Sequence, residues 1–304
     1  MPHSEETKRE AGLAARHGAA AHMQATANRN KAPIIPIVIG AIVVVGIGVF
    51  LLNDPNKQER EFGKAVESAD VRAQSTARGQ QGAFNLADST NVKLAPETSV
   101  KIPPGFNAQV HGILVQGAVA LTIKPITGEK ALPFRVRAKK VSIVSKGGVL
   151  LVRSYEDEPT VYVMAKDGDV TVRPNVDEKE TKPLTAGQAM SVDAKGATKM
   201  LSAEETAGAF SWVDGNYTLN AVPLSGVLPV LTRWYNTQAT IIDKSLEARP
   251  VTAVLKLSSS KEALDEVGKA ASVHIQYRGD TLTLADGAPT AANKVPAKAP
   301  KKGK

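Results

Sequence analysis

One stretch of the chain, residues 33–52 (PIIPIVIGAIVVVGIGVFLL), is apolar from end to end. A helix rises ~1.5 Å per residue, so a segment of this length covers ~30 Å, the hydrocarbon thickness of a membrane. Pro33 and Pro36 fall in its first turn, where a missing N–H is tolerated. A cleaved signal peptide has a shorter apolar core behind a short basic segment. The pattern therefore predicts a single transmembrane helix at residues 33–52.

Farther along, the hydrophobic period changes to two. Short Val-rich runs alternate with polar residues and are separated by turns rich in Gly and Pro, which is typical of half-buried strands. We expect a mostly β protein with an all-β domain over residues 83–211, built as a sandwich, a barrel or a solenoid. The predicted strands are residues 91–94, 99–102, 108–110, 112–115, 119–123, 133–138, 141–144, 149–153, 160–164, 169–173 and 189–192.

The pattern changes again after Trp212. Residues 212–286 contain two similar strand–helix–strand units, which predicts a C-terminal α/β module of two βαβ halves. Ser259 and Glu262 have the spacing of a capping box at the start of the second helix. Pro229 predicts either a kink in the first helix or a helix that begins there. The predicted strands are residues 217–222, 239–243, 251–257, 273–277 and 281–284, and the helices are residues 224–236 and 261–271.

The remaining segments are polar. Residues 1–32 read as a tail before the span, either a partner-binding handle or a disordered leader. Residues 53–82 read as a linker with a charged, helix-capable part at residues 59–72. Residues 287–304 are rich in Lys, Ala and Pro and are expected to be disordered.

Charge and composition narrow the function classes. The net charge is +8, but part of it lies in the C-terminal lysines and the rest is mixed in sign, so we expect no nucleic-acid partner. The chain has no cysteine, which excludes disulfides and thiolate metal sites. The numbers of Lys and Arg residues close to the two ends of the span are nearly equal. When the whole of residues 1–32 is counted, the N-terminal side has more of them, which favours a cytoplasmic N-terminus.

Candidate chemistry is sparse. None of the common hydrolase, nucleotide-binding or dinucleotide-binding motifs is present. Ser258 and Lys261 have a nucleophile-like spacing that we interpret as part of the helix cap. The Asp167-Gly168-Asp169 run reads as a hairpin turn, and residues 156–158 (EDE) as a solvated acidic turn. The histidines, which we interpret as separate residues rather than a metal site, are His3, His17, His22, His111 and His274. We therefore expect no catalytic, cofactor-binding or metal-binding residues, and a binding or signalling protein rather than an enzyme.

A series of short motifs resembles the FecR family in its order along the chain. The segment LADSTNVKL at residues 86–94 is similar to the family pattern L-x-D-G-S-x-V-x-L. The later segments are GAVAL at 117–121, PFRV at 133–136, GGVLLV at 147–152, DGDV at 167–170, LTAGQ at 184–188, WVDGNYTL at 212–219, PL at 223–224 and RWY at 233–235. The sequence departs from the pattern at Ser89, Ala118 and Val119, and no tryptophan precedes the span.

The resemblance implies a function. FecR proteins are inner-membrane regulators of extracytoplasmic-function sigma factors, linked to TonB-dependent transporters of the outer membrane. It implies a sigma-factor partner for residues 1–32, and a transporter signalling domain or another envelope protein as the partner of residues 84–286. It also implies a periplasmic C-terminal part, with residues 212–286 akin to the short domain at the N-terminus of secretins and signalling transporters. The alternative is a membrane-anchored periplasmic scaffold or assembly protein without a sigma-factor partner.

Overall fold

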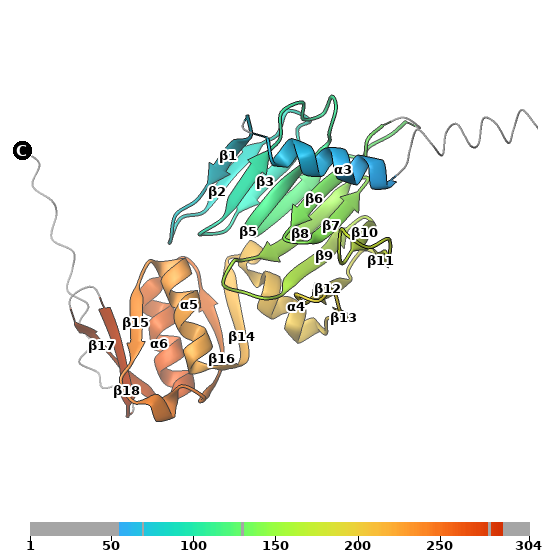
Figure 1. Ribbon diagram of the computed structural model, residues 1–304. Coiled ribbons are helices and arrows are strands. Elements are labelled where there is room, and N and C mark those ends of the chain that lie inside the picture. Colours follow the sequence, from blue (N-terminus) through green and yellow to red (C-terminus); the bar gives the residue numbers. More distant parts are fainter. Residues whose placement is uncertain (1–54, 69, 129–130, 279–280, 288–304) are drawn as a thin grey trace, which may run out of the picture. The chain divides into compact units, whose positions relative to one another are not determined.

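The computed structural model describes residues 55–68, 70–128, 131–278 and 281–287 (Figure 1). The predicted tail, the predicted span at residues 33–52 and residues 288–304 of the predicted disordered end lie outside these residues. Among the described residues, no helix is both long enough and apolar enough to cross a bilayer. From residue 58 onward the chain belongs to one compact unit.

The first part of that unit is a curled sheet, formed by thirteen strands of the described residues. Its central strand, β5 (Gly112–Ile123), pairs with β4 and β6 along its first residues and with β3 and β8 along its later residues, so it divides the sheet into two halves. The first half adds β1 (Arg72–Ser75), β4 (Ser99–Ile102), β6 (Phe134–Ala138), β7 (Val141–Ser145), β10 (Val170–Arg173) and β11 (Lys182–Leu184). The second half adds β2 (Gly82–Asn85), β3 (Asn91–Leu94), β8 (Gly148–Ser154), β9 (Val161–Asp167), β12 (Ala189–Val192) and β13 (Thr198–Met200).

The two halves share one core. In β3 and β4 the second and fourth residues are buried, which is the alternation expected of strands with one face inward. Apolar side chains of both halves, such as Ile143 in β7 and Val163 in β9, belong to the same buried cluster. Burial of each such side chain contributes ~1.5–3 kcal/mol. The mostly β prediction is confirmed, and the arrangement is sandwich-like.

The chain crosses between the halves at glycine corners. The turn at Gly147 and Gly148 leads from β7 to β8, and the turn at Gly168 leads from β9 to β10. A Cβ atom on Gly148 would lie 2.2 Å from the backbone oxygen of Asp167. The two corners therefore pack backbone against backbone, which requires glycine. The hairpin predicted at Asp167-Gly168-Asp169 is wrong, because β9 and β10 do not pair with each other.

Four other differences from the predicted elements stand out. Residues 108–110 form no strand, and Val110 makes only an isolated bridge to Phe106. The predicted strands at 112–115 and 119–123 are one strand, β5. The predicted linker contributes helix α3 (Pro55–Val66) and strand β1, which pairs with β4. A helix, α4 (Ala203–Phe210), follows the last strand, and a capping box between Ser202 and Glu205 marks its start.

The second part is the predicted α/β module, with an unexpected strand placement. Its elements are β14 (Asn216–Pro223), α5 (Leu224–Tyr235), β15 (Gln238–Ile241), β16 (Pro250–Lys256), α6 (Ser260–Ala271), β17 (Val273–Arg278) and β18 (Thr281–Asp286). The first strands of the two halves, β14 and β16, pair with each other, whereas β15 and β17 both pair with β18. The helices lie between these two small sheets (Figure 1).

The helix ends follow the sequence signals in part. Helix α6 begins at the predicted cap, where the side chain of Ser259 accepts a hydrogen bond from the backbone N–H of Glu262. Helix α5 begins at Leu224 and continues through Pro229, so a start at that proline is wrong. It ends at Asn236, whose left-handed backbone conformation terminates the helix.

Candidate functional site

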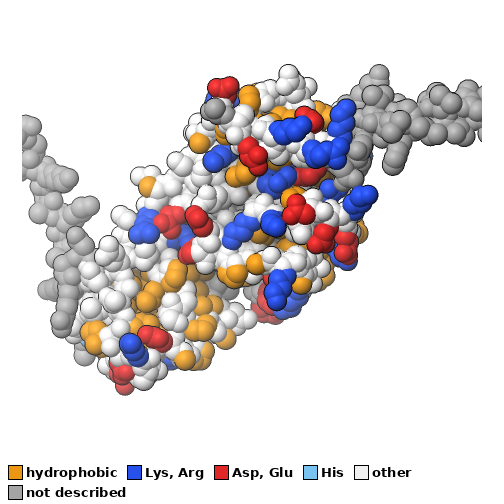
Figure 2. Space-filling model, viewed as in Figure 1, with side chains coloured by type: hydrophobic (Ala, Val, Ile, Leu, Met, Phe, Trp, Pro, Cys, Tyr) orange, Lys and Arg blue, Asp and Glu red, His pale blue; other side chains and the backbone are white. Residues whose placement is uncertain are grey.

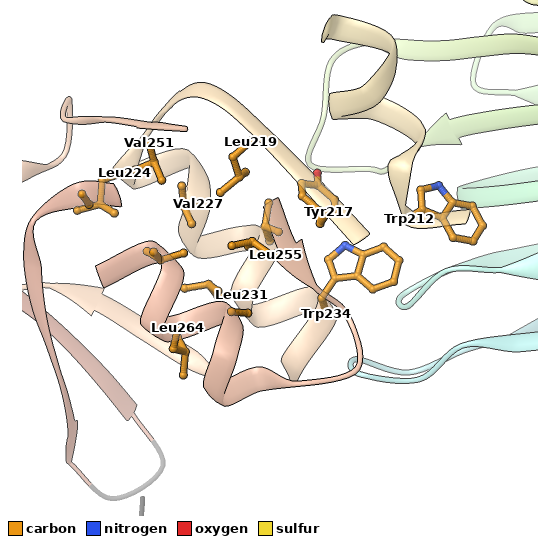
Figure 3. Close-up of a cluster of buried hydrophobic side chains, with 14 of the residues drawn as sticks. Trp212, Tyr217, Leu219, Leu224, Val227, Leu231, Trp234, Val251, Leu255 and Leu264 are labelled. Atoms are coloured by element: carbon orange, nitrogen blue, oxygen red, sulfur yellow. The ribbon is translucent and has the colours of Figure 1, made fainter. Parts of the chain in front are cut away.

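The two parts of the unit share a continuous hydrophobic core. Helix α4 and the short 3-10 turn η1 (Ser211–Asp214) pack on the outer face of the second half of the sheet, through contacts that include Leu151 and Phe210. The same buried cluster continues into the α/β module (Figure 3). The rings of Trp212 and Trp234 lie 6.1 Å apart, and those of Tyr217 and Trp234 lie 5.9 Å apart. The structure thus joins the two parts through aromatic packing.

Arg233 adds an ionic contact between the two parts. It lies in the last turn of α5, and its side chain is only 5% exposed. Its guanidinium lies over the ring of Tyr155, with 3.7 Å from Cζ to the ring centroid. Nη2 donates to both carboxylate oxygens of Asp157 at 2.9 Å, and Nη1 donates to Glu158 at 3.4 Å. Nε lies 3.3 Å from a carboxylate oxygen of Glu97. Three acidic side chains and one ring therefore hold a single arginine.

Arg153, at the end of β8, forms the second ionic contact. Its guanidinium donates to both carboxylate oxygens of Glu158, at 2.9 and 2.7 Å, and to the hydroxyl of Tyr217 at 2.8 Å. Burial opposes the charge of Arg153, but Tyr217 and Glu158 outweigh this effect and hold its pKa above the ordinary value. Glu158 thus binds two arginines that come from different parts of the unit.

Tyr155 completes this cluster, which we call the junction: Glu97, Arg153, Tyr155, Asp157, Glu158, Tyr217 and Arg233. The hydroxyl of Tyr155 donates to the backbone oxygen of Pro96 at 3.1 Å. Burial raises the pKa of Tyr155, so its phenol stays neutral between the two arginines. The prediction of a solvated acidic turn at residues 156–158 holds for the exposed Glu156 and Asp157, although Asp157 also pairs with Arg233. It is wrong for Glu158, which is 20% exposed and pairs with two arginines.

A cavity of ≈ 390 Å³ lies beside the junction. Arg153, Tyr162 and Tyr217 line it, together with Lys199 and Glu205. Lys199 and Glu205 pair with each other, and Arg153 already has its carboxylate and hydroxyl partners. Since the charged groups of this wall satisfy one another, the junction is suited to hold the two parts together.

His111 and Asp88 form a separate buried pair. The Nε2 atom of His111 lies 2.8 Å from a carboxylate oxygen of Asp88, and its Nδ1 lies 2.8 Å from the backbone oxygen of Leu132. Thr90 donates to both oxygens of Asp88. Burial tends to raise the pKa of Asp88, but the hydrogen bonds from His111 and Thr90 outweigh it and lower the pKa. The pair connects three loops of the domain.

A third polar cluster fixes helix α3 to the sheet. Glu59 is 5% exposed and pairs with Arg135 and Arg137 of β6. The hydroxyl of Ser142 in β7 donates to the same carboxylate at 2.7 Å. Burial lowers the pKa of Arg135. The charge of Glu59 counteracts this decrease, and the charge of the nearby Arg173 adds to it. Sequence reasoning missed this cluster, since Glu59 lies in a charged segment that reads as solvated.

The other residues singled out from the sequence do not come together. Lys261 pairs with Asp265 on the surface of α6 rather than with Ser258. His274 lies on β17 of the α/β module, whereas His111 lies just before β5 in the large sheet. The three tail histidines lie outside the described residues. Within the described residues, no group of three or more His, Asp and Glu side chains is arranged to hold a metal ion. On the face seen in Figure 2, basic and acidic side chains are interspersed.

Of the junction residues, Arg233 and Tyr217 belong to segments of the family resemblance, R-W-Y and WVDGNYTL. Arg153, Tyr155 and Glu158 carried none. A Tyr or Arg near a short β run reads equally well as a surface residue. Arg233 lies 75 and 76 positions from its partners Glu158 and Asp157, beyond the reach of any local pattern.

Comparisons with known proteins agree with this fold. Residues 72–171 match the family model described as FecR protein. Two crystal structures of a candidate anti-sigma factor from Parabacteroides distasonis, at 2.50 and 1.65 Å resolution, share the fold with a TM-score of 0.59 each. They are 19% and 18% identical to this chain and cover 72% and 71% of it, and the match takes in 100% of each of those chains. No curated protein sequence matches the chain. The chain thus carries a FecR domain at residues 72–171.

Proposed function

We propose that the chain is a single-pass inner-membrane signalling protein that regulates an extracytoplasmic-function sigma factor. The observation that carries the proposal is the FecR domain, in a fold shared with crystal structures of a candidate anti-sigma factor. In this proposal residues 1–32 contact the sigma factor in the cytoplasm, residues 33–52 cross the membrane, and residues 84–286 bind an envelope partner in the periplasm.

The junction supports a role in transmitting binding. Arg233 and Arg153 clamp the α/β module to the FecR domain, and the shared core leaves no flexible linker between them. We expect a partner that binds the α/β module to act on the FecR domain as well, because these contacts couple the two parts.

The α/β module has a surface suited to a protein partner. Among the described strands, β16 pairs only with β14, so its other edge has no strand partner. Val254 on this strand is 55% exposed and adds an apolar contact point beside the open edge. An edge of this kind binds an extended segment by strand addition. We assign it to the envelope partner, with the signalling domain of a TonB-dependent transporter as the first candidate.

The deciding experiment is photocrosslinking in cells. A photoreactive amino acid is placed at Ala11 or Ala20, and captured proteins are identified by mass spectrometry. Capture of a sigma factor from both positions supports the proposal, provided that the same probe at Lys195, in the exposed turn between β12 and β13, does not capture it. A tail that captures nothing specific, in cells that contain folded full-length protein, contradicts sigma-factor regulation and favours the envelope scaffold.

The absence of cysteine makes the membrane topology directly testable. Ser4→Cys and Lys195→Cys each introduce a single thiol into the chain. In intact spheroplasts, a membrane-impermeant maleimide is expected to label Lys195→Cys only, and Ser4→Cys should react after lysis. The reverse labelling would overturn the proposed orientation, and equal labelling of both thiols would overturn the membrane span.

A further inference from the structure

Helix α3 contacts the FecR domain through one narrow face. Glu59, Phe62, Gly63 and Val66 follow the spacing i, i+3, i+4 and i+7, which places them on one side of a helix. Phe62 and Val66 are 2% and 7% exposed and form a small cluster with Val110, separate from the main core. The opposite face, with Arg60, Glu61 and Lys64, is exposed. The apolar contact is therefore small, and the ionic contact of Glu59 supplies the specificity.

The surface of the sheet on which α3 packs would be basic if α3 were absent. Arg135, Arg137 and Arg173 lie close enough for their charges to repel, and all three belong to strands of the sheet. Arg135 is 6% and Arg173 8% exposed. The carboxylate of Glu59 is the acidic group that pairs with both Arg135 and Arg137, and the guanidinium of Arg137 also lies 5.9 Å from the ring centroid of Phe62. Removal of the helix would leave Arg135 and Arg137 without the carboxylate that pairs with both of them, and water or another carboxylate would have to replace it.

The helix depends on this surface for its own structure. A helix of 12 residues is marginal in water by itself, and Gly63 in its middle lowers its propensity further. We therefore expect α3 to unfold when it leaves the sheet, which would make the backbone of the segment accessible.

We propose that α3 is a detachable latch, in which Glu59 and Phe62 hold the segment between the predicted span and the FecR domain in a helical, protease-resistant form. The latched state is the one described in this structure. In the released state the segment is unfolded and its peptide bonds are open to proteases, while the sheet keeps its fold. The latch rests on the contacts of α3 alone and does not depend on the function proposed above.

The test is limited trypsin proteolysis of the purified full-length chain in detergent. Lys57, Arg60 and Lys64 offer cleavage sites within α3, and Lys195 in an exposed turn serves as the internal reference. Glu59→Gln removes the buried charge and should speed cleavage within α3 about tenfold relative to Lys195, because the open state becomes more populated. Glu61→Gln is the matched control, since Glu61 is on the exposed face and pairs only with exposed Lys64. It should cleave at the wild-type rate.

Phe62→Ala weakens the same contact without a change of charge and should also give selective cleavage within α3. Cleavage of both variants at the wild-type rate would overturn the latch. Cleavage that rises equally at the α3 sites and at Lys195 in both variants would also overturn it, because α3 would then be an integral part of the fold. The purified chain contains no sigma factor, so either result is independent of the crosslinking experiment on the tail.

Discussion

The guanidinium of Arg233 lies 3.7 Å from the centroid of the Tyr155 ring, although α5 and the FecR domain are separate in sequence. This contact brings a helix of the α/β module onto the loop that follows β8. The same arginine is paired with Asp157 and Glu158. A single side chain thus combines ring stacking with ion pairing where the two parts of the unit meet.

Removal of Arg233 should destabilise the whole unit. Arg233→Ala leaves Glu158 with one cation instead of two and exposes the Tyr155 ring, at an expected cost of about 2–4 kcal/mol. Arg233→Lys keeps the charge but loses the planar fork, and about half of that cost is expected. Urea unfolding followed by tryptophan fluorescence is the measurement, because Trp212 and Trp234 lie next to the junction. Lys269→Ala, in an exposed pair with Glu266, should change stability by less than about 0.5 kcal/mol. A similar loss in both variants would contradict a special role for Arg233.

The glycine corners should differ sharply in their tolerance of a side chain. Gly148→Ala places a Cβ atom 2.2 Å from a backbone oxygen at a φ of 100°, so a loss of about 3 kcal/mol or more is expected. Gly187 also has a positive φ, 83°, but a Cβ atom added there would have no other atom within 4 Å. Gly187→Ala should therefore cost only about 1 kcal/mol. Thermal unfolding of the two variants gives the comparison, and equal losses would show that the close approach of the corners is unimportant.

Replacement of Ser89 by glycine should increase the stability of the protein. Ser89 occupies the left-handed region, with φ of 66°, at the position where the FecR pattern has glycine. Ser89→Gly relieves this conformation and should stabilise the protein by about 0.5–1 kcal/mol. Ser191→Gly, in strand β12, serves as the opposite case. It should destabilise the protein by about 1 kcal/mol, because glycine loses more conformational entropy than serine when it is fixed in a strand. Chemical denaturation measures both, and a loss of stability in Ser89→Gly would refute the prediction.

The Asp88–His111 pair should make stability depend on acid. The lowered pKa of Asp88 means that its carboxylate contributes stability above the ordinary Asp value of 3.8, and that this contribution is lost as the pH falls through the lower folded value. Asp88→Asn should therefore be less stable than the wild type at neutral pH, by about 1–3 kcal/mol for hydrogen bonds to a charged group. The difference should be constant above about pH 5 and shrink as the pH falls below the ordinary Asp value of 3.8. Urea unfolding at a series of pH values tests this, and a constant difference would exclude Asp88 as the titrating group.

The sequence alone determined many of the strands and helices. In β3 and β4, alternation of apolar and polar residues predicted the strands to the residue, because one face is buried and the other is not. The start of α6 followed from Ser259 and Glu262, since a cap is a contact between residues close in the chain. The order of short motifs indicated the FecR family, and the match at residues 72–171 confirms it.

The tertiary structure decided how those elements pair and pack against one another. The pairing of Glu59 with Arg135 spans 76 positions, and that of Arg233 with Asp157 also spans 76, so neither leaves a local pattern. The turn at Gly168 has the composition of a hairpin, yet it carries the chain from one half of the sheet to the other. Local sequence sets the backbone geometry of a turn or a cap, whereas burial of a charge depends on which distant strand or helix packs over it. The junction and the anchor of α3 therefore emerge only when the chain is folded.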